Sequence, residues 1–423
     1  MMNLFDELQW RGLVSEATDG LANAFATEHV TAYIGFDPTA SSLHIGSLLT
    51  VMGLARLQRF GHSPIAIVGG GTGMIGDPSG KSQERTLLSR DQIEENVAGI
   101  RRQLERFLDF NRAANPARIV NNADWLAAFD LLGFLRDTGK YFTVNYMLQK
   151  ESVNRRLESE EGISYTEFSY LLLQARDFLE LFDRYGCTLQ MGGSDQWGNI
   201  TAGIDLIRKL RGRRVHGLVW PLMTTASGTK FGKTEAGTIW LDPARTSPFK
   251  FYQFWLNTDD RDVVEYLRFF TFLDRAAIAA LEAATKTAAE KREAQRVLAR
   301  EVTAIVHGAE QVARAERAST VLFGEDIATL DADDVLAVFA DVPSTELPAD
   351  ALGEGIGIVD LLARVQLAPS KGEARRLVQS GGVYLNNRRL SDPQSRVTRE
   401  QAIGGRLFVL RKGQRQNHLV KLV

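Results

Sequence analysis

Cysteine is almost absent from this sequence of 423 residues, which contains a single one, Cys187. One thiol cannot form an intramolecular disulfide and cannot build a multi-cysteine zinc site. No apolar run approaches the roughly 18 residues that a membrane-spanning helix needs. The amino terminus carries acidic side chains and no long apolar stretch, so we interpret it as neither a signal nor a transit peptide. These absences favour the reducing cytoplasm and no membrane partner.

The charges are distributed unevenly along the chain. The formal net charge is −2, but residues 371–423 contain 12 Lys or Arg against 3 Asp or Glu, a local balance of +9. The preceding residues therefore sum to −11. A basic tail on an acidic body suggests a polyanionic partner at one end of the chain. A solvated basic face explains the charge alone equally well.

Residues 30–225 alternate between strand and helix patterns. Apolar, β-rich runs occur at Thr31–Phe36, Pro64–Gly69, Arg118–Asn121 and Leu218–Met223. Helical patterns lie between or beside them at Leu48–Phe60, Gln92–Phe110, Thr166–Phe182 and Gln196–Arg211. This alternation predicts an α/β fold, with a mostly parallel sheet covered by helices on both faces. Ligands of such folds bind at the carboxyl ends of the strands, near a switch point in strand order.

The length exceeds one compact core and predicts two or three domains. We expect the α/β part to occupy residues 1–246, followed by a helical domain at 247–319, where apolar positions repeat at helical spacing. Residues 320–352 are acidic and contain prolines, which indicates a linker with modest structure. Residues 353–423 form a small α+β unit. Its expected elements are helices at Ile358–Val365 and Ser370–Gln379 and a turn-rich β segment around Val383–Leu390.

The block FDPTASSLHIGS, residues 36–47, follows a predicted strand and opens a helix. Free backbone N–H groups and the helix dipole therefore point toward whatever lies above the strand. His44 and Thr39 add donors suited to phosphate oxygens, and Gly46 allows a flat nucleotide to pack against the backbone. Taken alone, helix capping and packing is the better interpretation.

The block GGGTGMIGDPSGK, residues 69–81, also follows a predicted strand. Its spacing matches neither the Walker loop nor the dinucleotide-binding fingerprint. So many glycines imply close approach of the backbone to a ligand, and Asp77 offers a carboxylate in the same loop. Lys81 and Arg85 follow on a polar stretch. A tight turn with a solvated loop is the competing interpretation.

A polar stripe marks the block TEFSYLLLQARDF, residues 166–178. Tyr170, Gln174 and Asp177 lie at positions i, i+4 and i+7, hence on one helical face. That face either meets solvent or lines a polar pocket, and solvent is the better interpretation when the stripe is considered alone.

Two further blocks are weak as isolated motifs. QMGGSDQWGN, residues 190–199, is a glycine turn that enters a helix with Asp195 and Gln196 at its start. An aspartate that caps the helix is the simple alternative there. KFGKT, residues 230–234, places two lysines around a glycine in a loop after the last predicted strand.

Taken together, the order and spacing of the five blocks resemble the class I aminoacyl-tRNA synthetases, whose signatures are HIGH and KMSKS. HIGS at residues 44–47 and KFGKT stand in their places. YIGFDPTA, GDPSGK, EFSYLLLQARDF, GGSDQWGN and KFGKT are most similar to bacterial tyrosyl-tRNA synthetases. The resemblance runs from about residue 3 to the end, and the tail is similar to a small RNA-binding domain also found in a ribosomal protein.

The resemblance implies a Rossmann-like catalytic domain, a helical domain on the anticodon side and a C-terminal RNA-binding domain. It also implies a homodimer that activates L-tyrosine with ATP and transfers it to the 3′ end of tRNA(Tyr); DNA is not an expected partner. The tyrosine carboxylate, ionised near neutral pH, attacks the α-phosphorus without a general base. Catalysis is then positioning and electrostatic stabilisation. We expect Mg²⁺ with ATP, but no tightly bound cofactor and no dedicated protein metal site.

Individual roles follow from the resemblance. Tyr33 and Asp177 would contact the phenol, which needs a buried partner. The residues at or near the ammonium group would be Tyr170, Gln174, Asp77, Thr72, Asn122 and Gln196. The ATP-binding residues would be Asp37, Gly46, Ser47, Gly193, Asp195 and Lys233. The catalytic residues, which contact the γ-phosphate side or close over the pyrophosphate, would be Thr39, His44, Lys81, Arg85, Lys230, Lys233 and Thr234.

Two positions depart from the family pattern. Ser47 replaces the final His of HIGH, and Ile34 follows Tyr33 where a small polar or thiol side chain is familiar. Both lie where the family contacts ribose; Ser47 retains a donor, whereas Ile34 has none.

Two other functions compete with this interpretation. A tryptophanyl-tRNA synthetase shares the fold and both signatures, although Tyr33 and Asp177 favour a phenol over an indole. A non-enzymatic RNA-binding or scaffold protein fits the basic tail but leaves the lysines of KFGKT without a role.

Overall fold

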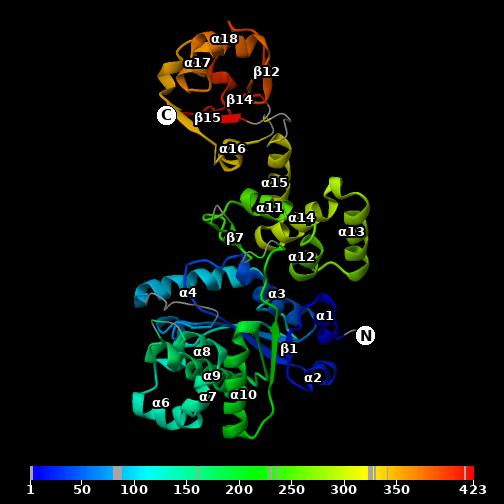
Figure 1. Cartoon of the computed structure of the whole chain (residues 1–423), viewed down its shortest axis with the longest axis vertical. Helices are drawn as coiled ribbons and strands as arrows, with labels where there is room; N and C mark the ends of the chain where they lie inside the picture. The colour runs from blue at the N-terminus through cyan, green and yellow to red at the C-terminus, as the bar shows by residue number, and fades with distance from the viewer. Residues whose placement is uncertain are drawn as a thin grey trace. The chain divides into compact units, whose positions relative to one another are not determined.

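The computed structural model describes residues 3–79, 88–158, 160, 162–226, 228, 231–234, 237–322, 327, 330–340, 342–413 and 416–423 (Figure 1). The chain divides into two compact units. The first contains Met1–Arg245 and Thr258–Leu298, and the second contains Thr246–Asn257 and Ala299–Val423. No helix in the described ranges is both long and apolar enough to cross a membrane. The division into four segments expected from the sequence, at residues 1–246, 247–319, 320–352 and 353–423, stays a prediction.

A six-stranded sheet forms the centre of the first unit. Its strands are β1 (Glu16–Ala17), β2 (Thr31–Phe36), β3 (Ser63–Val68), β4 (Arg118–Asn121), β5 (Leu189–Gly193) and β6 (His216–Trp220). Their order is β1-β6-β5-β2-β3-β4, and every neighbouring pair is parallel except β1 with β6. The chain order reverses between β2 and β5, so the switch point of this α/β sheet lies there. The predicted α/β fold class is confirmed.

Helices cover both faces of this sheet. Figure 1 shows α4 on one side and α9 and α10 on the other. The helical elements of the first unit are α1 (Leu4–Arg11), α2 (Leu21–Thr27), α3 (Ile45–Arg59), η1 (Thr72–Met74), α4 (Arg90–Leu104), α5 (Ala123–Leu126), α6 (Leu131–Asp137), η2 (Gly139–Tyr141), α7 (Val144–Leu148), α8 (Glu151–Leu157), α9 (Tyr165–Tyr185), η3 (Ser194–Gln196), α10 (Trp197–Arg211), α12 (Val263–Phe270), α13 (Arg275–Thr287) and η4 (Ala289–Lys291). Two short strands, β7 (Lys233–Thr234) and β8 (Gly237–Thr238), pair antiparallel.

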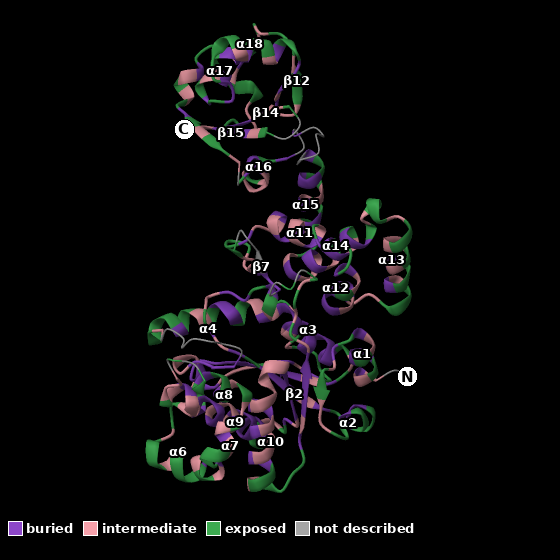
Figure 2. Ribbon diagram, in the orientation of Figure 1, coloured by how far each residue is buried: buried purple, intermediate pink, exposed green. Residues whose placement is uncertain are grey.

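Local chemistry explains where the long helices begin and end. Ser89 and Gln92 form a reciprocal capping box at the start of α4, and Ser164 caps α9. Helix α9 ends at Gly186, whose φ of 63° lies in the left-handed region that glycine adopts at low cost. The apolar runs of β2 and β3 are buried almost throughout, as expected for strands covered on both faces (Figure 2).

The second unit combines helices with a small sheet. Its elements are α11 (Pro248–Leu256), α15 (Ala309–Leu322), α16 (Ala332–Val338), β9 (Ser344–Leu347), η6 (Ala349–Leu352), β10 (Ile356–Gly357), α17 (Ile358–Arg364), α18 (Lys371–Gln379), β11 (Val383–Leu385), β12 (Arg388–Leu390), β13 (Arg396–Val397), η7 (Arg399–Gln401), β14 (Leu407–Lys412) and β15 (Gln416–Leu422). Helix α14 (Glu293–His307) has residues in both units. Five strands form a sheet in the order β12-β11-β14-β15-β9, with β9 parallel to β15. Asn386 and Asn387, both at positive φ, make the tight turn between β11 and β12.

Most elements expected from the sequence are confirmed with shifts of a few residues at their ends. Strands β2 and β4 have the predicted bounds, and α17 and α18 correspond to the two helices predicted near the C-terminus. Strand β5 was not expected, because its segment contains two glycines and resembled a turn. It nevertheless lies near the middle of the sheet, paired with both β2 and β6.

Candidate active site

A cavity of about 580 Å³ opens in the first unit at the carboxyl ends of β2 and β5. Residues from the loops after β3 and β6, from α3 and from α9 complete its wall. The structure brings together the following predicted residues on this wall: Tyr33, Asp37, Thr39, His44, Gly46, Ser47, Thr72, Asp77, Asn122, Tyr170, Gln174, Asp177, Gly193, Asp195 and Gln196. The cavity therefore lies at the switch point, the place where ligands of α/β folds bind.

The remaining predicted residues have cationic or hydroxyl side chains. Lys81, Arg85 and Lys230 lie outside the described residues. The backbone of Lys233 and Thr234 forms β7, but their side chains are likewise not described. The roles expected for these five residues stay predictions.

A buried donor and a buried acceptor mark one part of the cavity. The Asp177 carboxylate accepts hydrogen bonds from Asn122 Nδ2 at 2.8 Å and Trp125 Nε1 at 2.7 Å. Burial raises the pKa of Asp177 to about 7, although these two hydrogen bonds act in the opposite direction. The Tyr33 hydroxyl is buried and has no hydrogen-bond partner among the described residues. Burial, and then the nearby Asp177 carboxylate, raises the Tyr33 pKa well above its usual value, so this hydroxyl stays protonated.

A chain of hydrogen bonds leads from Asp177 to the edge of the sheet. Asn122 Nδ2 also donates to Thr72 Oγ1 at 2.9 Å, and Thr72 Oγ1 donates to Asp37 Oδ1 at 2.9 Å. The other Asp37 oxygen accepts from the Tyr170 hydroxyl at 3.0 Å. A Cβ atom at Gly69 would collide with the Asp37 carboxylate and the Thr72 hydroxyl, so only glycine fits there.

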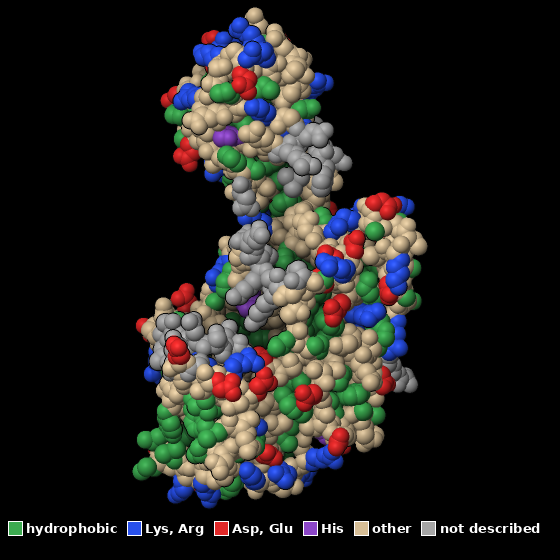
Figure 3. Space-filling view, viewed as in Figure 1, with side chains coloured by type: hydrophobic (Ala, Val, Ile, Leu, Met, Phe, Trp, Pro, Cys, Tyr) green, Lys and Arg blue, Asp and Glu red, His purple; other side chains and the backbone are tan. Residues whose placement is uncertain are grey.

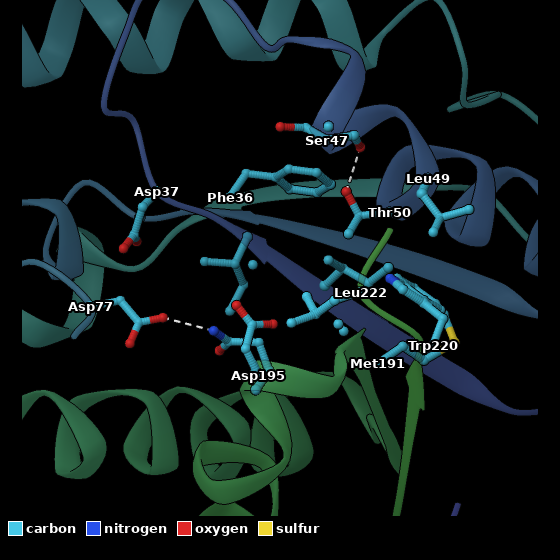
Figure 4. Close-up of a pocket in the computed structure, with 18 of the residues that line it drawn as sticks. Phe36, Asp37, Ser47, Leu49, Thr50, Asp77, Met191, Asp195, Trp220 and Leu222 are labelled. Carbon is cyan, nitrogen blue, oxygen red and sulfur yellow. Dashed lines mark hydrogen bonds between the residues drawn. The ribbon is translucent and has the colours of Figure 1, made fainter. Parts of the chain in front are cut away.

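A second carboxylate, Asp77, is held by amide side chains. It accepts from Gln196 Nε2 at 2.7 Å, and Gln196 Oε1 accepts from Gln174 Nε2 at 3.1 Å. Gln174 Oε1 in turn accepts from Asn199 Nδ2 at 3.0 Å. Asp77 and Asp37 lie on the same side of the cavity (Figure 4). Because the Tyr170 hydroxyl donates its hydrogen bond to Asp37, the Tyr170 oxygen remains free to accept, and together with the Asp77 carboxylate and the Gln174 amide oxygen it suits an ammonium ion.

The other side of the cavity contains the start of α3. His44 is the N-cap residue of this helix, and its Nδ1 accepts from the Gly46 N–H at 3.0 Å. Ser47 therefore does not occupy the cap position. Its carbonyl accepts from the Thr50 hydroxyl, and Ser47 and Asp195 lie on opposite sides of the cavity (Figure 4). Ile34 also lines the cavity, where its side chain offers no hydrogen bond.

The two signature segments adjoin one another. Ile45 N–H donates to the Ile239 carbonyl at 3.0 Å, and Leu241 N–H donates to the Leu43 carbonyl at 2.9 Å. Gly232, at a φ of 86°, lies against the start of α3, where an added Cβ would meet Ile45 Cγ1 at 3.1 Å. Gly232, in the described part of KFGKT, thus lies beside HIGS, although the two segments are far apart in sequence.

Sequence reasoning missed three residues of the site. Trp125 and Asn199 hold the side chains described above, and Gln190 lines the cavity opposite Tyr33 in the β2–β5 register. Gln190 Oε1 is buried without a partner among the described residues. Gln190 and Asn199 are the first and last residues of the block QMGGSDQWGN, so the block itself was the available signal. Trp125 follows Asn122 by about one helical turn.

Comparisons with known proteins agree with this geometry. The family model "tRNA synthetases class I (W and Y)" matches residues 26–324, and the model of a tyrosine–tRNA ligase C-terminal domain matches residues 334–420. The tyrosine–tRNA ligase of Roseiflexus castenholzii is 58% identical over the full length of both chains. That of Geobacillus kaustophilus is 54% identical over 99% of this chain and 100% of its own.

Solved structures show the same relationship. A C-terminally truncated mitochondrial tyrosyl-tRNA synthetase from Aspergillus nidulans has a TM-score of 0.70 and 30% identity, covering 76% of this chain and 95% of its own. A tryptophanyl-tRNA synthetase from Encephalitozoon cuniculi shares the fold, with a TM-score of 0.51 and 16% identity over 73% of this chain and 87% of its own. From these matches, the chain belongs to the tyrosine–tRNA ligases, within the class I tRNA synthetase family.

Proposed function

We propose that this protein activates L-tyrosine with ATP and transfers the tyrosyl group to the 3′ end of tRNA(Tyr). The observation that carries this proposal is that the same cavity contains both the Tyr33 hydroxyl and the Asp177 carboxylate. A phenol hydroxyl can donate to the Asp177 carboxylate and accept from the Tyr33 hydroxyl, which otherwise has no partner among the described residues. An indole N–H can donate but cannot accept, so tryptophan would leave Tyr33 unsatisfied.

The rest of the amino acid fits the hydrogen-bond network beyond Asp177. We assign Tyr170, Gln174 and Asp77 to the ammonium group, since each offers an oxygen on the same cavity. Thr72, Asn122 and Gln196 orient these acceptors through the hydrogen bonds that they make.

The nucleotide would occupy the side of the cavity formed by α3 and the loop after β5. We assign Asp37, Gly46, Ser47, Gly193 and Asp195 to the adenosine, and Thr39 and His44 to the γ-phosphate side. The cations expected over the pyrophosphate are Lys81, Arg85, Lys230 and Lys233, with Thr234 beside them. These side chains are neutral or cationic, so they suit phosphate oxygens better than a metal cation. We therefore expect Mg²⁺ to arrive bound to the ATP phosphates, as part of the substrate.

The chemistry proceeds in two displacements. A tyrosine carboxylate oxygen forms a bond to the α-phosphorus while the bond to pyrophosphate breaks. The terminal adenosine hydroxyl of the tRNA then attacks the activated carbonyl, and AMP leaves. The protein contributes alignment of the reactants and charge stabilisation rather than a general base.

ATP–pyrophosphate exchange with each amino acid in turn tests this function. We expect exchange with tyrosine, much weaker exchange with phenylalanine and none above background with tryptophan. Exchange that depends on tryptophan would favour the tryptophanyl alternative. Absence of ATP binding and of exchange with every amino acid would favour a non-enzymatic RNA-binding protein.

The C-terminal part of the second unit is the proposed tRNA-binding surface. Lys371, Arg375 and Arg376 on α18 and Arg388 and Arg389 on β12 are all exposed. Figure 3 shows Lys and Arg side chains around the part of the chain that carries these elements. Such a surface can follow a phosphate backbone. Since tRNA charging supplies protein synthesis, we also propose a cytoplasmic location.

An apolar patch on the first unit supports the expected homodimer. Leu131 and Leu132 on α6 are 72% and 76% exposed, and Val144 on α7 is 60% exposed. Leu135 and Tyr165 are also exposed. Figure 3 shows hydrophobic side chains gathered at the lower left, where α6 lies in Figure 1. Contiguous apolar patches of this kind mark interaction sites, and we propose a second copy of this chain as the partner.

Leu132→Asp should convert the dimer to a monomer. A two-fold interface loses two buried leucines at about 1.5–3 kcal/mol each, which raises the dimer dissociation constant on the order of 10²- to 10⁴-fold. Size-exclusion chromatography with light scattering measures the mass. Val423→Asp is the matched control, because Val423 is 67% exposed outside the patch. An unchanged mass for Leu132→Asp would remove the patch as the interface.

A further inference from the structure

Asp262 occupies the N-cap position of α12, yet its carboxylate does not cap that helix. Both carboxylate oxygens instead accept from the Ala226 N–H, at 3.0 and 3.1 Å, from a residue 36 positions earlier in the chain. Asp262 is buried, with 8% of its surface exposed. An aspartate at this position ordinarily stabilises its own helix by accepting from its first-turn N–H groups. In this structure the Asp262 carboxylate instead binds Ala226, which lies outside α12.

Ala226 belongs to the segment that leads from β6 into KFGKT. Phe231 N–H donates to the Met223 carbonyl at 3.3 Å, so the ends of residues 223–231 are joined. Within this segment, Gly228 N–H donates to the Thr225 carbonyl at 2.8 Å. Met223, Gly228 and Phe231 all line the cavity. Asp262 therefore holds a piece of backbone that forms part of the cavity wall.

Helix α12 contacts this segment at a second point. The Phe231 ring packs against Tyr266, with centroids 5.1 Å apart, and stacks on Phe270 at 5.3 Å with an interplanar angle of 17°. Asp262, Tyr266 and Phe270 follow one another at intervals of four residues, so they share one helical face. That face contacts Ala226, which precedes KFGKT, and Phe231, which belongs to it.

The far end of α12 is anchored by two buried arginines. Arg11 Nη1, from α1, donates to the Arg268 carbonyl at 2.7 Å. Arg56 Nη2, from α3, donates to the Thr271 carbonyl at 2.9 Å. Cationic donors satisfy the free carbonyls at a helix C-terminus and interact favourably with its dipole. Because α3 begins at the HIGS segment, these contacts tie α12 to the same helix that supplies the other signature.

We propose that α12 sets the positions of Ala226 and of Phe231, the described residues at the entry to KFGKT, relative to the start of α3, with Asp262 as a positioning residue for the first step. This inference rests on the proposed function, because it assigns a place to the segment whose lysines stabilise the departing pyrophosphate. Loss of the Asp262–Ala226 contact would misplace charge that acts in the transition state and leave the tyrosine pocket unaltered.

Asp262→Ser separates positioning from helix stability. Serine is a good N-cap residue, but its side chain is shorter, so the variant should keep α12 stable while it loses the bond to Ala226. We expect the rate of tyrosyl-adenylate formation to fall about tenfold or more, the scale of one hydrogen bond to a charged group. The tyrosine dissociation constant and the melting temperature should stay near wild-type values. Asp262→Asn keeps one acceptor oxygen, so its rate of tyrosyl-adenylate formation should lie between those of the wild type and Asp262→Ser.

The matched control is Asp259→Ser, three residues earlier, whose exposed carboxylate pairs with Arg261. Hydrogen exchange of the peptide that contains Ala226 gives a readout independent of activity. Exchange at Ala226 should accelerate in Asp262→Ser and stay unchanged in Asp259→Ser.

Three results would overturn the proposal: a wild-type rate despite faster exchange at Ala226, unchanged exchange at Ala226, or a rate loss that merely follows a lower melting temperature. If the wild-type chain shows no tyrosine-dependent exchange of pyrophosphate, the proposed function fails instead. The hydrogen-exchange comparison still reports the Asp262–Ala226 contact in that case.

Discussion

Asp177→Ala should lower kcat/KM for tyrosine activation by about 10- to 150-fold, the equivalent of one lost hydrogen bond to a charged group. Phenylalanine has no hydroxyl and makes no such bond, so kcat/KM for phenylalanine should change little. The ratio of kcat/KM values for the two amino acids should therefore fall by nearly the whole amount. Pyrophosphate exchange with each amino acid over a range of concentrations measures both values.

The same substitution has a structural cost that must be separated from its effect on substrate. Asn122 and Trp125 would each lose the acceptor that they now share, at about 1–3 kcal/mol per buried donor left unpaired. Melting temperature reports this cost. Asp183→Ala, on the same helix but in an exposed pair with Arg211, is the control and should leave activation unchanged. Equal losses for tyrosine and phenylalanine would place the phenol elsewhere in the cavity.

The pH dependence of stability and of tyrosine affinity gives a second measurement of the role of Asp177. The folded protein holds the Asp177 proton more tightly than the unfolded chain, because burial raises its pKa from 3.8 to about 7. This contribution to stability is complete below about pH 4 and is lost as the pH rises through about 7. Tyrosine binding favours the ionised Asp177 carboxylate, because that form accepts a hydrogen bond from the phenol hydroxyl. Tyrosine affinity should therefore fall below about pH 7, and Asp177→Asn should remove that dependence.

A chain that ends after Leu322 should separate the two steps of the reaction. The predicted cavity residues that the structure describes lie in the first unit, so adenylate formation should stay near the full-length rate. Charging of tRNA should fall on the order of 10³-fold, if three charged contacts of about 1.5 kcal/mol each are removed. Aminoacylation and pyrophosphate exchange on the same preparation measure the two steps.

The dependence of tRNA affinity on salt concentration provides a check on the truncation experiment. In the full chain, tRNA affinity should fall steeply with ionic strength, because each neutralised phosphate releases counterions. Arg375→Ala combined with Arg376→Ala should make that dependence less steep by about 1.4–1.8 in the log–log slope, while adenylate formation is retained. If the truncated chain charges tRNA as well as the full chain does, the basic tail is not the RNA-binding surface.

Much of the architecture follows from local sequence. Strands β2 and β4 and the long helices α3, α9 and α10 were predictable, since apolar β-rich runs and helical periodicity are local signals of secondary structure. The spacing of Tyr170, Gln174 and Asp177 also placed them on one helical face. Periodicity could not decide whether that face meets solvent or a cavity, because the answer depends on what packs against α9. In the structure Tyr170 and Asp177 are buried on the cavity wall.

The sequence by itself determined the fold class, the family resemblance and the segments that carry the site, because each of these depends on short, local stretches of sequence. Tertiary structure alone decided which side chains meet. Trp125 reaches Asp177 across 52 positions, Asp262 reaches Ala226 across 36, and Gln190 faces Tyr33 through the pairing of β5 with β2. Such contacts depend on how distant elements pack. Neither composition nor spacing specifies them, and the hydrogen bonds form only after burial has brought the partners together.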